Sequence, residues 1–327
     1  MITASAPGKI ILFGEHAVVY GKPAIVAAIN KRIYVTSQLT DSGIHIFSKG
    51  NTESSIDYVR HAIELIIGTE RIKKQGIDII IDSELPVGGG LGSSAALCIA
   101  TIKSISTLFN INLDKEKIAK LGWETEFKVQ SMSSGIDPFI STYGGAIYYK
   151  NGKFNYQKID TSLSMILGYT GIPSSTKSMI LKVSHLRERY PEIINPIINA
   201  IGNISERAKI IFDTSSQKFE NYKSLIYKKS NSLNINDLGD LMNLNNNLLE
   251  ALGVSSISLS ELIDVSLLAG ALGAKITGAG GGGCILAYTP KKEIEVLDAI
   301  KIAGGIPIPI EISFEGVRLE PNLKDRA

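Results

Sequence analysis

The stretch of the chain best suited to chemistry is PVGGGLGSSAA, at residues 86–96. Its glycines lack Cβ atoms, so their backbone can take left-handed angles and approach a ligand closely. A helical pattern follows, and the unpaired N–H groups at a helix start attract phosphate oxygens. A capping turn is the simpler interpretation, but four glycines in five residues cost much conformational entropy. We therefore predict a phosphate-binding loop made by Gly88, Gly89, Gly90, Gly92, Ser93 and Ser94.

A second glycine-rich segment, TGAGGGG at residues 277–283, lies between two predicted strands. Alone it would be interpreted as a β-bulge or a tight hairpin. Beside the first loop, a second set of backbone donors could hold a phosphorylated ligand from another side. We therefore expect Gly278, Gly280 and Gly281 to contact phosphate.

Polar residues gather near the start of the chain, where Lys9 stands in an apolar strand and Glu15 is followed by His16. Apolar strands rarely contain a lysine unless its charge is used or reaches solvent. These residues suggest a polar pocket. The alternative for His16 is a hydrogen-bonded histidine with a purely structural role.

Two carboxylates, Glu126 and Asp137, are candidates for metal binding and proton transfer. A Mg²⁺ ion that carries nucleotide phosphates needs only one or two protein oxygens, which Ser94 and Glu126 could supply. Asp137 could accept the proton of an attacking alcohol, with Lys9 nearby to hold it ionised. Each carboxylate could instead be a surface charge, but the small residues in SSGIDPFISTYGG favour a site at Asp137.

Composition limits the function classes. The 327 residues suffice for two domains of roughly 100–200 residues each. A net charge of +2 predicts neither a nucleic-acid binder nor a membrane-surface protein. Cys98 and Cys284 lack metal-ligand spacing and are interpreted as buried thiols in a reducing compartment. With no signal-peptide pattern and no apolar run of roughly 18 residues, we expect a soluble, cytoplasmic protein.

The hydrophobic pattern alternates between strand and helix periods. We expect a change of domain near residue 165, which gives an N-terminal domain at 1–165 and a C-terminal domain at 166–327. Asp137 is expected in a loop that enters a strand. The predicted strands cover 2–13 with a break at Pro7-Gly8, 24–29, 34–39, 44–47, 77–81, 142–149, 164–170 and 310–319, and two more flank the glycine turn in KITGAGGGGCILAY. The predicted helices cover 54–67, 94–109, 114–126, 191–212, 217–229, 237–252, 260–271 and 291–303.

Three segments, APGKIILFGEH, PVGGGLGSSAA and KITGAGGGGC, resemble the three signature motifs of the GHMP kinases. They occur in the family order and bracket nearly the whole chain. Within the family, GEHAVVYGKPA and SGIDPFISTYGG are similar to the corresponding segments of the mevalonate kinases. Pro138 departs from the polar residue that is common at that position.

The resemblance implies an α+β fold of two domains, the first ribosomal-protein-like with a left-handed βαβ crossover and the second ferredoxin-like. ATP would lie between them, with its phosphates on the first glycine loop and the second loop closing over it. Ser94 and Glu126 would hold Mg²⁺, Asp137 would be the general base, and Lys9 would orient the alcohol. Glu15 and His16 would contact mevalonate, and the enzyme would be a cytoplasmic homodimer.

Two other functions remain open. The chain could be a phosphomevalonate kinase or another small-molecule kinase of the family. A phosphorylated acceptor would need extra cationic residues, for which Lys22, Lys177 and Lys182 are candidates. A non-catalytic small-molecule sensor could keep the fold, but the loss of Lys9, Asp137 or Glu126 that would indicate it has not occurred.

Overall fold

The computed structural model describes residues 1–48, 53–68, 75–130, 134–157, 159, 163–220 and 237–321. Within these ranges the first sheet has seven strands in the order β11-β1-β2-β4-β3, with β5 paired to β2 and β6 to β5. All of its pairings are antiparallel except that of β3 with β4. Its strands are β1 (Ile2–Phe13), β2 (Ala24–Thr40), β3 (Ile44–Ser48), β4 (Gly76–Ser83), β5 (Ala146–Lys150), β6 (Lys153–Tyr156) and β11 (Arg318–Leu319).

The predicted break at Pro7-Gly8 is a shift of register within β1, between Pro7 and Lys9, and the strand continues across it. A bulge of this kind re-aims the side chains that follow it. The predicted strands at 24–29 and 34–39 are one long strand, β2, which continues through the register shift opposite Gly8 and pairs with β1 on both sides of it.

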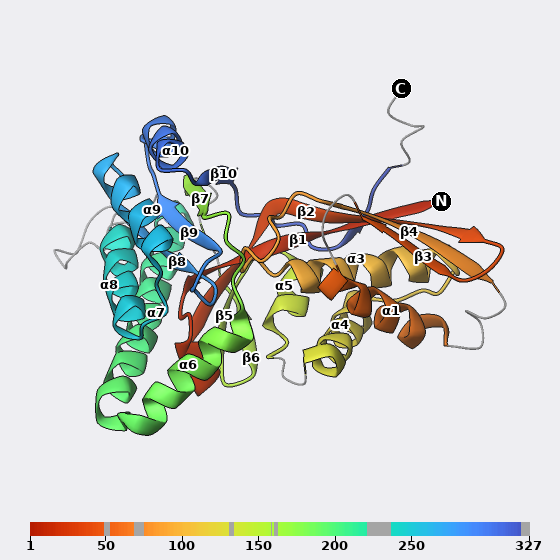
Figure 1. Ribbon diagram of the computed structural model, residues 1–327, viewed down its shortest axis with the longest axis horizontal. Coiled ribbons are helices and arrows are strands. Elements are labelled where there is room, and N and C mark those ends of the chain that lie inside the picture. Colours follow the sequence, from red (N-terminus) through yellow and green to blue (C-terminus); the bar gives the residue numbers. More distant parts are fainter. Residues whose placement is uncertain are drawn as a thin grey trace.

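One face of the first sheet carries α1 (Glu53–Ile67), α3 (Ser93–Leu108) and α4 (Lys115–Gln130), with the short α5 (Ile136–Tyr143) beside them (Figure 1). Helix α3 is the central one, and most of its side chains from Ala95 to Ser106 are buried. Its burial fixes the glycine loop at its N-terminus against the sheet. Strands β3 and β4 are parallel and joined through α1; the left hand of this crossover stays a prediction.

Asp137 lies in the first turn of α5 and not in a loop that enters a strand. The predicted strand at 142–149 was therefore wrong at its start, since helix α5 runs to Tyr143 and β5 begins only at Ala146. Pro138 is compatible with this helix because the first turn has no intrahelical N–H bond for proline to remove.

The second sheet has four antiparallel strands in the order β10-β7-β9-β8 among the described residues. Numbered along the chain this order is 4-1-3-2, the split βαβ arrangement of a ferredoxin-like domain, as the family resemblance implied. Its strands are β7 (Met165–Tyr169), β8 (Gly273–Thr277), β9 (Cys284–Tyr288) and β10 (Ile306–Ile310). Its helices are α6 (Thr176–Arg189), α7 (Pro191–Glu220), α8 (Asp237–Ala251), α9 (Ile257–Leu268) and α10 (Glu293–Ile302) (Figure 1).

Two further predicted elements differ from the structure, and one helix was not predicted. The strand expected at 310–319 is two separate strands, β10 ending at Ile310 and β11 at 318–319, and β11 returns to the first sheet. The prolines of β10 are tolerated because it is an edge strand. Helix α6 was not predicted. Of the helix expected at 217–229, residues 217–220 belong to α7 and the remainder lies outside the described residues.

None of the helices in the described ranges has both the length and the apolar character needed to cross a bilayer. Cys98 and Cys284 are both buried and unpaired, as expected.

Candidate active site

Lys9 and Asp137 face each other at the centre of the site, with Lys9 Nζ 3.4 Å from Asp137 Oδ2. Lys9 comes from β1, just after the bulge, and its backbone N–H donates to Leu91 O. Asp137 is in the first turn of α5, where the helix dipole stabilises a negative charge. Lys9 is nearly buried, whereas the Asp137 side chain keeps 28% of its surface exposed. The carboxylate can therefore still be reached by a substrate.

The first glycine loop packs directly on this pair. Gly92 is the N-cap of α3 and has a φ of +69°, in the left-handed region. A Cβ atom there would lie 2.8 Å from Lys9 Cγ and 3.4 Å from Asp137 Oδ2. Glycine is thus required twice, by the backbone angle and by the approach of Lys9. The N-terminus of α3, where Ser93 and Ser94 stand, is presented beside the ion pair.

Tyr58, a buried residue of α1, hydrogen-bonds with Ser94 and is influenced by the charge of Glu126. Burial, reinforced by the charge of Glu126, raises the pKa of Tyr58 to about 12, and hydrogen bonds with Gln130 and Ser94 oppose the rise. A hydroxyl and a half-buried carboxylate are hard oxygen donors of the kind that Mg²⁺ prefers. Within the described residues no group of three or more His, Cys, Asp or Glu forms a metal cage.

The second glycine loop joins β8 to β9, so the hairpin interpretation was right about its topology. It also lies against the first loop. A Cβ atom on Gly278 would be 3.1 Å from Gly90 O, and one on Gly283 would be 3.1 Å from Gly89 O. Tyr169 also fixes the start of the first loop, because its hydroxyl donates to Val87 O. The two loops therefore form one continuous backbone surface.

His16 is bonded to the second loop. Its Nε2 lies 2.8 Å from Ala279 O and must donate, since a carbonyl oxygen can only accept. Burial lowers the pKa of His16, and the bond to Ala279 O opposes the shift. In the neutral form of the ring, this donation by Nε2 leaves Nδ1 as an acceptor. His16 therefore connects the end of β1 to the glycine loop that follows β8.

Glu15 is fully buried and forms an ion pair with Lys275 of β8, which is also fully buried. Its other oxygen accepts a bond of 3.1 Å from Asn245 Nδ2 on α8. Burial raises the pKa of Glu15 and lowers that of Lys275, while each charge opposes the shift in the other. Both carboxylate oxygens are thus engaged by the protein, so this arrangement does not support the expected direct contact of Glu15 with mevalonate.

Sequence reasoning missed Lys275, Asn245 and Tyr58. Lys275 stands in the apolar strand GAKIT, so the argument applied to Lys9 would have found it. Asn245 and Tyr58 carry no local signal, because each acquires its partner only through packing of distant helices.

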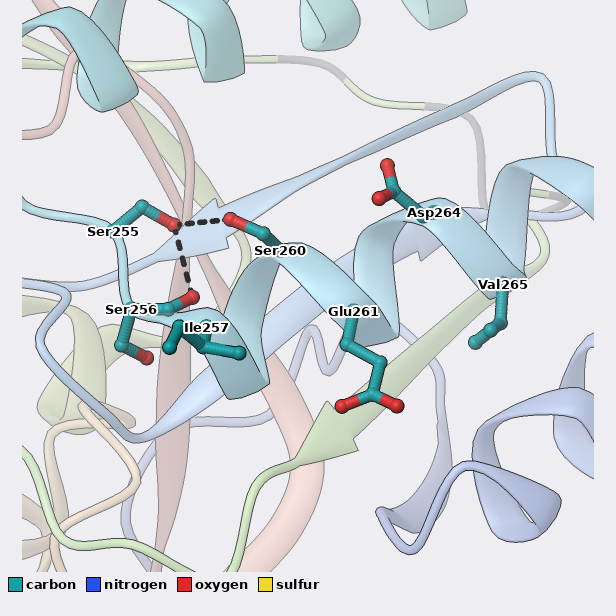
Figure 2. A pocket seen from close by; sticks show the side chains of 7 residues that line it. All are labelled: Ser255, Ser256, Ile257, Ser260, Glu261, Asp264 and Val265. Carbon is teal, nitrogen blue, oxygen red and sulfur yellow. Dashed lines mark hydrogen bonds between the residues drawn. The ribbon is translucent and has the colours of Figure 1, made fainter.

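A recess beside the N-terminal half of α9 contains none of the predicted site residues. Figure 2 shows Ser255 bonded to the Ser260 hydroxyl and to Ser256 O, with Glu261 and Asp264 projecting from the helix. Two carboxylates would repel phosphate groups. The lining residues are Ser255, Ser256, Ile257, Ser260, Glu261, Asp264 and Val265.

Two family models match the chain. The model described as GHMP kinases N terminal domain matches residues 57–145, and the one described as GHMP kinases C terminal matches residues 226–305. Among curated relatives, a protein named mevalonate kinase from Thermococcus sibiricus is 46% identical over 98% of both chains. Another of that name, from Archaeoglobus fulgidus, is 40% identical over 86% of this chain and 90% of its own.

Solved structures of proteins named mevalonate kinase are also similar to this chain. The structure of L. major mevalonate kinase in complex with R-mevalonate is similar with a TM-score of 0.79 and 25% identity, covering 94% of each chain. That of the Methanococcus jannaschii mevalonate kinase is similar with a TM-score of 0.76 and 26% identity, covering 95% of this chain and 98% of its own.

Proposed function

The chain belongs to the GHMP kinase family, and on that premise we propose that it phosphorylates the primary hydroxyl of mevalonate. The reaction would convert ATP and mevalonate into ADP and 5-phosphomevalonate. The observation that carries the proposal is the Lys9–Asp137 pair beside the first glycine loop, in a chain whose archaeal relatives at 44–46% identity are named mevalonate kinase.

The chemistry asked of the pair is proton transfer with positioning. The alcohol oxygen attacks the γ-phosphorus, the bond to the β-phosphate oxygen breaks, and ADP leaves. Asp137 Oδ2 would accept the hydroxyl proton as the new bond forms, because a carboxylate is far too weak a base to ionise the alcohol beforehand. Lys9 would orient the hydroxyl while it stays paired with the carboxylate. Catalysis by positioning and charge is what phosphoryl transfer requires.

ATP is the phosphoryl donor, as expected for a kinase of this family. Its phosphates would lie on the amides of the two glycine loops. The first loop leads into α3, whose N-terminus also attracts phosphate oxygens. We propose that Mg²⁺ is held by Ser94 and Glu126, where it would neutralise charge on the β- and γ-phosphates. Ser94 and Glu126 both act on the pKa of Tyr58, Ser94 through a hydrogen bond and Glu126 through its charge, which supports their lying near the same point.

His16 is the residue we propose to face mevalonate, through its free Nδ1. The lysines that a phosphorylated acceptor would need have other surroundings. Lys182 Nζ donates to Gly253 O, and the side chain of Lys22 packs on Gly202 of α7. Lys177 is exposed on α6. The contacts of Lys22 and Lys182 favour mevalonate over phosphomevalonate, whereas the exposure of Lys177, in the first turn of α6 beside the second glycine loop, does not distinguish the two acceptors.

The remaining assignments rest on the family resemblance. We propose a homodimer in the cytoplasm, with a division between domains near residue 165. The start of the second sheet at Met165 supports this division, although β11 returns to the first sheet.

The experiment is an ADP-release assay with ATP, Mg²⁺ and a panel of mevalonate, phosphomevalonate, galactose and homoserine. We expect turnover with mevalonate and none with the other acceptors. Turnover with phosphomevalonate alone would overturn the assignment of mevalonate as acceptor and leave the family assignment intact. If none of the four acceptors led to ADP release, the proposed function would be contradicted.

A further inference from the structure

The buried ion pair of Glu15 and Lys275 joins the two sheets of the molecule. Glu15 follows the end of β1 in the first sheet, and Lys275 is the middle residue of β8 in the second. Neither residue has solvent exposure. The pair lies next to the site but does not belong to the catalytic groups, and the phosphoryl-transfer steps above make no use of it.

Every donor of the Lys275 ammonium group is used. Besides Glu15 Oε1, Nζ bonds to Ile276 O at 2.8 Å and to Ile11 O at 3.2 Å. A lysine has three such donors, so its head is held without a spare bond. The partners come from β8 and β1, so this one group fixes the distance between those strands.

The strand that carries Lys275 is itself held on its open edge by asparagines of α8. Asn243 Oδ1 accepts from Ala274 N, and Asn246 Oδ1 accepts from Ile276 N. These bonds satisfy N–H groups that an edge strand would otherwise leave unpaired. Asn245, between them in the sequence, donates to Glu15 instead. Helix α8 thus holds both Glu15 and the strand that carries Lys275 in place.

The bonds between the two sheets continue from the Glu15–Lys275 pair into the second glycine loop. Thr277, two residues after Lys275, accepts from Ile11 N at 3.1 Å and donates to Ile11 O at 3.2 Å. His16 then bonds to Ala279 O. Lys275, Thr277 and His16 are all buried. Three side chains therefore fix this loop to the strand that also carries Lys9.

Stability is a weak reason to keep such a pair. Removing two charges from water costs more than their attraction commonly returns, and apolar residues of similar volume often replace a buried pair without loss. What an apolar pair cannot supply is the set of directed bonds from Lys275 to both strands. Geometry is therefore the property that this pair provides.

We propose that Glu15 and Lys275 are positioning residues that set the second glycine loop relative to Lys9 and Asp137. This inference rests on the proposed function, because it assumes that the loop contacts the phosphates during transfer. It assigns Glu15 to the support of the loop and not to contact with the acceptor.

The test uses Lys275→Met, Glu15→Gln and the double variant in the full-length protein, each assayed below its melting temperature. We expect each single variant to lower kcat by roughly 10- to 100-fold, since small misplacements of reacting groups are costly. The KM for mevalonate should stay within about threefold of the wild-type value. The double variant should be about as slow as the slower single variant, because the residues act as a unit.

The matched control is Lys292→Met with Glu295→Gln, which removes an exposed ion pair of 2.6 Å at the start of α10. It should leave kcat unchanged. A folded Lys275→Met enzyme with wild-type kcat would overturn the proposal, since a purely structural pair predicts that result. An increase of KM for mevalonate of about tenfold in Glu15→Gln alone would also overturn it, because that change marks a substrate contact.

A neutral variant covers the case in which the charge variants do not fold. Thr277→Val keeps the shape of the side chain and removes both bonds to Ile11, so kcat should fall by roughly tenfold; an unchanged kcat would refute the positioning role. If the wild-type enzyme uses another acceptor of the panel, the proposed function fails. The same variant-to-wild-type ratios measured with that acceptor still decide the inference.

Discussion

Gly92→Ala should displace Lys9 from Asp137 without replacing either residue. The added Cβ would lie 2.8 Å from Lys9 Cγ and 3.2 Å from Lys9 Cε. Carbon atoms in contact sit about 3.5–4.0 Å apart, so Lys9 Cγ must retreat by roughly 0.7–1.2 Å. The bond of Lys9 Nζ with Asp137, now 3.4 Å, would then lengthen or change direction.

A displacement of that size is large for catalysis. About 1 Å of misplacement can cost on the order of 10²-fold, so we expect kcat to fall by roughly 10- to 100-fold. The left-handed backbone at Gly92, with φ of +69°, adds a second effect. A residue with a Cβ costs about 1–2 kcal/mol in that region, which should appear as a lower free energy of unfolding.

Gly152→Ala is the control that isolates the backbone effect. Gly152 has a φ of +76°, but a Cβ atom there would meet nothing within 4 Å. Both variants should lose similar stability in urea unfolding, and Gly92→Ala alone should lose kcat. If Gly92→Ala were destabilised like the control but kept the wild-type kcat, the placement of Lys9 would not limit the reaction.

Three further predictions concern the metal, the phosphates and the ion pair. Glu126→Gln should raise the Mg²⁺ concentration for half-maximal rate, because Mg²⁺ prefers a charged oxygen, whereas Glu124→Gln on the same helix should not; equal Mg²⁺ curves would refute the ligand role. Gly90→Val should weaken ATP binding in calorimetry while the protein stays folded. The Cβ atom alone would lie 3.3 Å from Thr277 O, so the larger valine side chain would take up space between the two loops where the phosphates are proposed to lie. Unchanged ATP binding would mean that the loop has only a structural role. Lys9→Met should lower kcat, and its effect should add less than fully to that of Asp137→Asn in a double-mutant cycle, because the two groups act together; full additivity would separate their roles.

Much of the site follows from local sequence. Glycines in PVGGGLGSSAA predict a loop before a helix, and the structure has that loop at the N-terminus of α3. A lysine inside an apolar strand predicts a use for its charge, and Lys9 is paired with Asp137. These predictions succeed because the requirement lies in the residue itself, as a missing Cβ or a buried charge.

Other features depend on residues far apart in the chain. Lys275 meets Glu15 across 260 positions, so neither residue reveals its partner locally. The helix at Asp137 was missed because proline disfavours the helical region for the residue before it, and Asp137 precedes Pro138. In the structure Phe139 stacks on Phe154 and Tyr143, and this packing overrides the local preference.

The most direct test of the central claim is single-turnover phosphorylation of mevalonate followed by ³¹P NMR, with wild-type enzyme and Asp137→Asn. The wild-type enzyme should convert ATP and mevalonate into ADP and a phosphomonoester. Asp137→Asn should bind both substrates in calorimetry but react roughly 10²–10⁴-fold more slowly, because the proton acceptor is lost. Asp264→Asn, which changes an exposed aspartate of α9, should react like the wild type. A near-normal rate in Asp137→Asn would contradict the assignment of Asp137 as the general base.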